Sequence, residues 1–194
     1  HVDERILEVV NHPLKGENLN QTLWFFRNVT DQVSSQQQLE HLAFHDRLTD
    51  LPNRDKITLF IEEQIRQGIP ISCLALSMDR WRSLSDMLGH KGVESLLLQI
   101  AERLQATIHA RDVLARLDSS EFLVLLSDER SQLAKQKAEK CYAALSQPFD
   151  IDGTVITLTM RAGISHYPED ATTAEELIEY AKLALHASFN EAQN

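Results

Sequence analysis

The chain has 194 residues, of which 43% are hydrophobic and 25% are charged, a composition typical of one globular domain with a short appendage. Its formal net charge of −10 disfavours binding to nucleic acid and direct contact with anionic membranes. No apolar stretch approaches the roughly 20 residues that span a bilayer, and no secretory signal is visible. The sequence starts at His1 rather than Met, so we expect a piece of a longer cytoplasmic protein whose remainder can include a membrane anchor.

Residues 1–31 predict two β-strands. A short apolar run covers residues 6–10 and is broken by Asn11-His12-Pro13, and an aromatic strand covers residues 22–29. Two strands alone cannot bury a core. The stretch from Phe26 to Asp31 resembles the last strand of PAS sensor domains, which leads into a signalling helix. The resemblance implies that residues 1–31 are the C-terminal strands of a truncated PAS-like domain, a sensor in cis.

Residues 32–45 predict a signalling linker helix. The stretch is rich in Ser and Gln, contains no Gly or Pro, and can be capped by Thr30 or Asp31. A sparse apolar stripe runs along it: Val33, Leu39 and Leu42. This stripe favours a homodimer in which two copies of the helix form a coiled coil, although one or two heptads leave the pairing open.

Residues 46–194 predict an α+β domain with one sheet covered by helices. Strands are expected from the apolar runs, and helices from the amphipathic stretches between them. The predicted elements are a helix over 53–67, a strand over 71–78, helices over 80–88 and 93–108, hairpin strands over 113–117 and 122–126, a helix over 131–145, a strand over 155–165 and a helix over 174–189.

Five segments of this domain resemble GGDEF domains, the diguanylate cyclases. Asp46 to Arg54 resembles the D-x-L-T-G-L-x-N-R start of the family, and Gly89-His90 matches its G-H pair. Asp118-Ser119-Ser120-Glu121-Phe122 lies where the family has its Gly-Gly-Asp/Glu-Glu-Phe signature. Ala162 to Ser165 resembles the S-x-G-I-A strand, and the segment that starts at Ala181 resembles the A-D-x-A-L-Y-x-A helix.

The resemblance implies a nucleotide-cyclase-palm-like fold, with a central, mostly antiparallel sheet flanked by helices. It also implies a chemistry, because members of the family join two GTP molecules into cyclic di-GMP across a dimer interface. That reaction needs a divalent metal beside the triphosphates, held above all by carboxylates.

The metal-binding positions of the family are changed in this sequence. Ser77 and Ser120 stand where the resemblance places the two carboxylates, and a serine hydroxyl is a weak, neutral ligand for magnesium. Asp79 and Glu121 survive nearby and are either a substitute metal site or structural groups. We therefore expect no cofactor, and magnesium only if some GTP binding remains.

The signature turn is also changed. Asp118 and Ser119 replace the two glycines that let the backbone approach a phosphate, and Asp118 adds a negative charge there. Asp and Ser suit a tight turn, so the hairpin is expected to form without glycine. Glu121 and Phe122 keep the last two letters of the signature.

Guanine and phosphate contacts are weakened at the positions that the resemblance assigns to them. Ser85 replaces an Asn, and Glu94 keeps a carboxylate on a longer arm. Arg82 keeps the positive charge of the family lysine, or is simply a solvated helix residue. The basic residue of the last helix maps near Glu179, a charge reversal.

The product-inhibition motif Arg-x-x-Asp of the family maps onto residues 109–112. Asp112 is kept, but His109 replaces the arginine whose planar guanidinium clamps guanine and phosphate. Arg111 lies two positions away. We expect this inhibitory site to be lost.

Cysteine and histidine residues predict no further chemistry. Cys73 and Cys141 are expected to be small buried hydrophobic residues in a reducing compartment. His41 and His45 are four apart on the linker helix, a spacing that can bind zinc, but no third ligand is in view.

The preferred interpretation is a degenerate GGDEF domain without cyclase activity, acting as a regulatory or dimerisation module between a PAS-like sensor and, as an expectation, a cyclic-di-GMP phosphodiesterase (EAL) domain. The alternatives are a weakly active diguanylate cyclase that uses Asp79 and Glu121, and a module that binds nucleotide without turnover.

Overall fold

A computed structural model describes residues 5–16, 19–127 and 131–191. The chain divides into two compact units, residues 1–43 and residues 44–194. None of the described helices combines the length and the hydropathy that a bilayer crossing needs.

The first unit contains a two-stranded antiparallel ribbon of β1 (Leu7–Gly16) and β2 (Leu19–Asn28). The predicted break at Asn11-His12-Pro13 is wrong, because β1 continues through these residues and Pro13 pairs with Thr22. Each strand of a two-stranded ribbon keeps one unpaired edge, so a proline without an amide hydrogen can be accommodated there.

Helix α1 (Thr30–Phe44) follows the ribbon and has no buried residue. The predicted caps Thr30 and Asp31 are wrong, because the helix begins earlier than expected. Instead, Asn28 Oδ1 accepts hydrogen bonds from the Thr30 backbone N–H (3.1 Å) and hydroxyl (2.7 Å). The Thr30 hydroxyl accepts from the backbone N–H of Ile6 at 2.9 Å, which ties the start of the helix to the ribbon.

The second unit is built on a four-stranded sheet whose order is β4-β5-β3-β8. All three pairings are antiparallel, which confirms the predicted α+β palm-like fold. The strands are β3 (Ile71–Met78), β4 (Val113–Arg116), β5 (Glu121–Ser127) and β8 (Met160–Tyr167). Strands β4 and β5 form the predicted signature hairpin.

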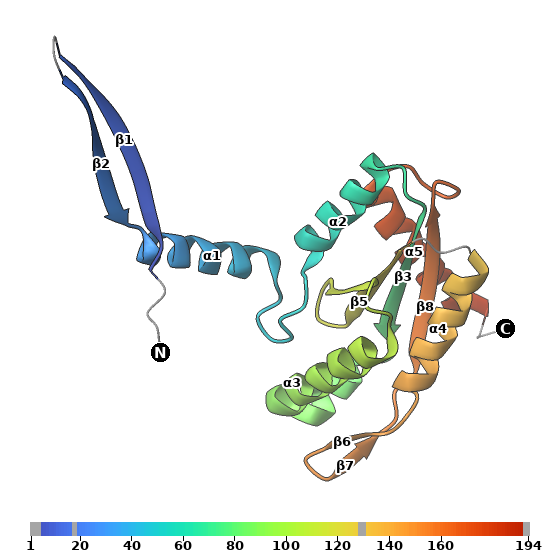
Figure 1. Ribbon diagram of the computed structural model, residues 1–194. Helices are drawn as coiled ribbons and strands as arrows, with labels where there is room; N and C mark the ends of the chain where they lie inside the picture. Colours follow the sequence, from blue (N-terminus) through green and yellow to red (C-terminus); the bar gives the residue numbers. More distant parts are fainter. Residues whose placement is uncertain (1–4, 17–18, 128–130, 192–194) are drawn as a thin grey trace. The chain divides into compact units, whose positions relative to one another are not determined.

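Helices cover both faces of this sheet (Figure 1). Side chains alternate along β3: Leu74 and Leu76 pack with α3 and α4 on one face, whereas Cys73 and Ala75 pack with α2 and α5 on the other. The four helices are α2 (Arg54–Arg66), α3 (Trp81–Thr107), α4 (Ser131–Leu145) and α5 (Ala174–Glu191).

A break at Gly89 divides α3 into the two helical segments expected from the sequence. The backbone there has φ 63° and ψ 179°, a conformation that glycine adopts without steric cost. The segment before the break carries Arg82 and Ser85, and the segment after it carries Glu94 and the buried core residues Leu96 and Ile100.

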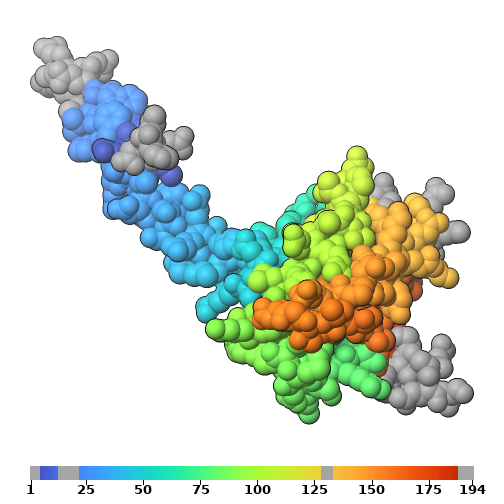
Figure 2. Space-filling model, turned by 90° about the horizontal axis from the view of Figure 1, so that it is seen from below, coloured from blue at the N-terminus to red at the C-terminus, as the bar shows by residue number. Residues whose placement is uncertain are grey.

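A short hairpin, β6 (Phe149–Ile151) and β7 (Thr154–Ile156), is absent from the prediction. The expected strand over 155–165 is in fact two strands, β7 and β8. Asp152 and Gly153 form the turn with φ values of 51° and 83°, which is the Asp-Gly signal of a tight hairpin. The hairpin packs against α3, as the orange and green surfaces of Figure 2 show.

Strand β8 and helix α5 lie side by side (Figure 1), and their backbones approach each other closely at Gly163. A Cβ atom at this position would overlap the backbone of Ala181 and Leu185. The glycine is therefore required by packing rather than by its backbone angles.

Candidate functional site

The end of β3 and the tip of the signature hairpin lie at the same edge of the sheet. The backbone N–H of Met78 donates to the carbonyl of Ser120 at 3.3 Å, and Ser77 is the cross-strand partner of Glu121. The structure thus brings together the two positions at which the sequence predicts lost metal ligands. Both carry hydroxyls instead of carboxylates.

Asp79, which follows β3, is paired with Arg161 of β8. The guanidinium donates from Nη2 to Asp79 Oδ1 at 2.6 Å, and the Arg80 backbone N–H donates to the same oxygen at 2.9 Å. The hydrogen bond from Arg161 lowers the pKa of Asp79 below its ordinary value, and Arg80 acts in the same direction. The carboxylate is therefore ionised at neutral pH and already has a cationic partner.

Glu121, the fourth signature residue, is paired with Lys182 of α5. Lys182 Nζ lies 2.8 Å from Glu121 Oε2, and the two side chains are only 19% and 14% exposed. The contact is an ion pair without hydrogen-bond alignment. Glu179, the predicted charge reversal on this helix, is exposed. The cation that reaches the signature hairpin is Lys182, about one turn further along α5.

Sequence reasoning missed both cations. Arg161 stands where the S-x-G-I-A pattern has its serine, and Lys182 stands where A-D-x-A-L-Y-x-A has its aspartate. These two departures from the family pattern were the available signal.

The donor set at this edge does not fit a magnesium ion. Magnesium needs hard oxygen ligands, chiefly carboxylates, in near-octahedral arrangement. Ser77 and Ser120 offer neutral hydroxyls, while Asp79 and Glu121 face cations. Among the residues that the structure describes, no group of three or more His, Cys, Asp or Glu is arranged to hold a metal.

The hairpin tip is held by the guanidinium of Arg116. Nε donates to the Asp118 carbonyl at 3.1 Å, and Nη2 donates to the Ser119 carbonyl at 3.3 Å. Nη1 donates to Asp46 Oδ1 at 2.9 Å. The Asp118 carboxylate accepts from the Ser120 backbone N–H at 3.0 Å, so Asp118 closes its own turn. The hairpin therefore forms without the signature glycines.

Asp46 is an acceptor for several donors at the start of the second unit. Burial by itself would raise the pKa of its carboxyl group, but hydrogen bonds from the Thr49 backbone and hydroxyl and from Arg116 outweigh burial. The pKa of Asp46 consequently lies below its ordinary value.

The predicted nucleotide-contacting residues lie along α3. Arg82 is exposed, and Ser85 is partly exposed. Glu94 Oε1 lies 3.4 Å from His90 Nδ1, one turn earlier on the same helix. Their role in nucleotide binding stays a prediction.

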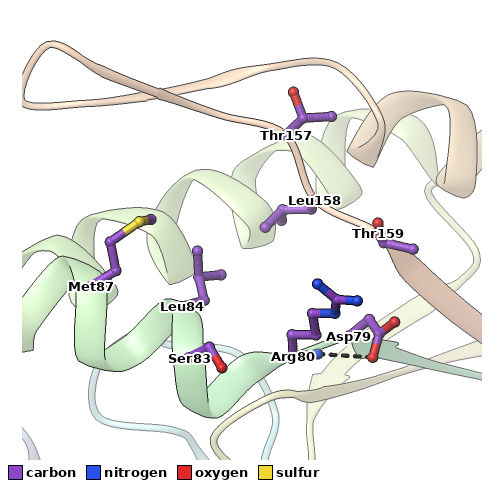
Figure 3. Close-up of a pocket in the computed structure, with 8 residues that line it drawn as sticks. All are labelled: Asp79, Arg80, Ser83, Leu84, Met87, Thr157, Leu158 and Thr159. Atoms are coloured by element: carbon purple, nitrogen blue, oxygen red, sulfur yellow. Dashed lines mark hydrogen bonds between the residues drawn. The ribbon is translucent and has the colours of Figure 1, made fainter.

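A pocket of about 520 Å³ opens beside Asp79, between the first half of α3 and the segment that joins β7 to β8 (Figure 3). Leu84, Met87 and Leu158 line its apolar part, and Arg80 projects between them and Asp79 (Figure 3). Among the described residues that line it, the predicted guanine contacts do not appear. Asp79, one of the two possible substitute metal ligands, does line it.

The two predicted inhibitory-site residues, His109 and Asp112, differ in burial and in hydrogen bonding. The Asp112 carboxylate accepts from the His109 backbone N–H at 3.0 Å and from Lys137 Nζ at 2.9 and 3.0 Å. The Asp112 side chain is 1% exposed, whereas His109 is exposed. Asp112 thus serves the packing of α4, and the loss of the inhibitory site stays a prediction.

Cys73 and Cys141 are buried and form no disulfide, which confirms them as core residues. Burial raises the pKa of the Cys73 thiol to about 12 and that of Cys141 to about 11.

The family assignment follows from comparison with known proteins. The family described as "Diguanylate cyclase, GGDEF domain" matches residues 43–194. The chain belongs to the GGDEF family.

Relatives and solved structures agree with this assignment. The chain is 32% identical over 169 residues to the bifunctional diguanylate cyclase/cyclic di-GMP phosphodiesterase MucR of Pseudomonas aeruginosa, covering 85% of this chain and 25% of MucR. It is 30% identical over 189 residues to the diguanylate cyclase TpbB of the same species, covering 92% of this chain and 42% of TpbB. A sensory box/GGDEF family protein from Caulobacter crescentus superimposes with a TM-score of 0.70 at 28% identity, covering 76% of this chain and 99% of that one. The chain thus spans less than half the length of these two curated relatives.

Proposed function

We propose that this chain carries a degenerate GGDEF domain of a cyclic-di-GMP signalling protein, without cyclase activity, which serves as a regulatory or dimerisation module. The observation that carries the proposal is the presence of Ser77 and Ser120 at one edge of the sheet, joined through the Met78–Ser120 backbone hydrogen bond. Loss of two carboxylates that would face a divalent ion costs several kcal/mol. At about 1.4 kcal/mol per tenfold, that is several decades of rate.

The hairpin tip supports the same proposal. Asp118 directs a carboxylate at the backbone N–H of Ser120, one of the groups of the turn that could otherwise meet a phosphate. The guanidinium of Arg116 is already hydrogen-bonded to two carbonyls and to Asp46. The carbonyls of Asp118 and Ser119 and the backbone N–H of Ser120 therefore already have hydrogen-bond partners within the protein.

We infer that residues 1–31 are the last strands of a PAS-like domain and that residues 32–45 are its signalling helix. The ribbon leaves Trp24, Phe25 and Phe26 exposed, as expected for strands that belong to a larger sheet. Leu39 and Leu42 are exposed on α1, which suits pairing with a second copy as a homodimer. A GGDEF domain together with a coiled coil is known in DgcB of Caulobacter crescentus.

An EAL phosphodiesterase domain in the same protein is the proposed output. MucR is named for both cyclase and phosphodiesterase activities, and this chain covers only a quarter of its length. The proposal includes a cytoplasmic location, which a signalling role of this kind would require.

The direct test incubates the chain with GTP and magnesium or manganese and measures cyclic di-GMP by chromatography, with the diguanylate cyclase TpbB as positive control. We expect no product. Robust synthesis would overturn the proposal and favour the alternative, a weak cyclase that uses Asp79 and Glu121.

A second candidate function is nucleotide sensing without turnover, for which the exposed cation of Arg82 is the supporting observation. Calorimetric titration with GTP, with and without magnesium, tests it. The matched variant is Arg82→Gln. Heat of binding that disappears in this variant supports the candidate, and its absence in the wild-type chain removes it.

A further inference from the structure

Three strands contribute neighbouring residues to one row at the sheet edge. Ser77 on β3 has Glu121 as its partner on β5 and Arg161 as its partner on β8. Directly opposed residues in an antiparallel sheet point to the same face with Cβ atoms about 5 Å apart. Ser77 therefore stands between a carboxylate and a guanidinium.

This row lies on the face that α5 covers. Gly163, two residues after Arg161 on β8, approaches the backbone of α5, and Lys182 of that helix reaches Glu121. The side chain of Arg161 is 21% exposed and extends to Asp79 at the end of β3. Two internal cations thus reach the two carboxylates that remain at this edge.

The formal charges of the two ion pairs balance. Asp79 and Glu121 contribute two negative charges, and Arg161 and Lys182 contribute two positive charges. A divalent cation that approached either carboxylate would meet a fixed positive charge within about 3 Å of it, in a partly desolvated setting where repulsion is stronger than in water.

We propose that Arg161 and Lys182 are built-in replacements for a divalent cation, which close this edge to metal and make its structure independent of metal. The inference deepens the proposed function and rests on it. It also has a consequence for reversion of the lost ligands. An aspartate at position 77 would have Arg161 as its cross-strand neighbour, so it would enter an ion pair instead of creating a metal site.

The test compares manganese binding by four forms of the chain. These are the wild type, the reversion variant Ser77→Asp/Ser120→Asp, the cation variant Arg161→Ser/Lys182→Asp, and the combination of all four substitutions. Binding is measured by electron paramagnetic resonance of free Mn²⁺, and stability by the shift of Tm with MnCl₂. We expect no Tm shift for the wild type or the reversion variant. The combined variant should bind Mn²⁺ at least about tenfold more tightly than the reversion variant and gain stability from it.

Two controls separate charge from general damage. Arg66→Ser removes one positive charge from an exposed pair with Glu63 on α2 and should leave the chain insensitive to Mn²⁺. Arg161→Lys keeps the charge and should do the same. If the combined variant does not fold, Ser77→Asp/Arg161→Ser is compared with Ser77→Asp alone, and only the former should respond to Mn²⁺.

Equal Mn²⁺ affinity of the reversion and combined variants would overturn the inference, as would Mn²⁺ binding by the wild type that Asp79→Asn abolishes. If the wild type binds Mn²⁺ through Asp79 but makes no cyclic di-GMP, the inference about the two cations is wrong and the proposed function still stands. Synthesis by the wild type removes the proposed function.

Discussion

Lys137 of α4 places its Nζ within 3.0 Å of both carboxylate oxygens of Asp112, in the loop before β4. The Asp112 side chain is 1% exposed, and that of Lys137 is 23% exposed. A residue that the family resemblance assigns to ligand binding is thus a buried link between a loop and a helix.

Asp112→Ala should destabilise the domain by about 3 kcal/mol, because it removes a buried carboxylate that forms an ion pair with Lys137. The His109 backbone N–H also loses its acceptor. Urea unfolding measures the change. The double variant Asp112→Ala/Lys137→Met should recover part of the loss, and equal destabilisation by the single and double variants would contradict the explanation.

Gly163→Ala should prevent native packing of α5 on β8 or cost at least about 4 kcal/mol, because the added methyl group would overlap the backbone of Ala181 and Leu185. Thermal unfolding provides the measurement. Gly153→Ala is the control, since that glycine has φ 83° but open space around it, and strain alone costs about 1 kcal/mol. Similar Tm values for both variants would contradict the packing argument.

Acid should destabilise the second unit through Asp46. Its pKa is lower in the folded chain than the unfolded value of about 3.9, so its stabilising effect is fully present above that pH. The effect is lost as the pH falls through the lower folded value. The difference in unfolding free energy between wild type and Asp46→Asn should therefore be constant from neutral pH to about pH 5 and shrink below about pH 4. A constant difference down to pH 2 would contradict it.

The two thiols should react only when the chain unfolds. With a pKa of about 12, the Cys73 thiol is ionised in only about one molecule in ten thousand at pH 8. Cys141, with a pKa of about 11, is also buried. Labelling with iodoacetamide, followed by mass spectrometry, should show neither modified under native conditions and both modified in urea. Fast native labelling of Cys141 would show that α4 opens locally.

Local patterns predicted the sheet strands and the main helices, because strongly apolar runs and amphipathic periods decide these elements before tertiary contacts do. The hairpin of β6 and β7 was missed because each strand has three residues, too few for a period. Its Asp152-Gly153 turn was the remaining signal. The continuation of β1 through Pro13 depends on its pairing with β2, which the local sequence pattern does not predict.

The positions of the candidate site residues on the sheet edge could be inferred from the sequence, whereas the cations beside them could not. Ser77 and Ser120 were identified from their positions in the family pattern. The pairing of Arg161 with Asp79 joins residues 82 positions apart, and it depends on β3 and β8 being neighbours in one register. Such contacts follow from the assembled sheet and not from local sequence.

Arg116 connects the signature hairpin to the start of the second unit. Asp46 is the third residue of the second unit, and the same guanidinium holds both its carboxylate and the carbonyls of Asp118 and Ser119. One side chain therefore joins the point where the chain enters this domain directly to the hairpin tip, by hydrogen bonds outside the hydrophobic core.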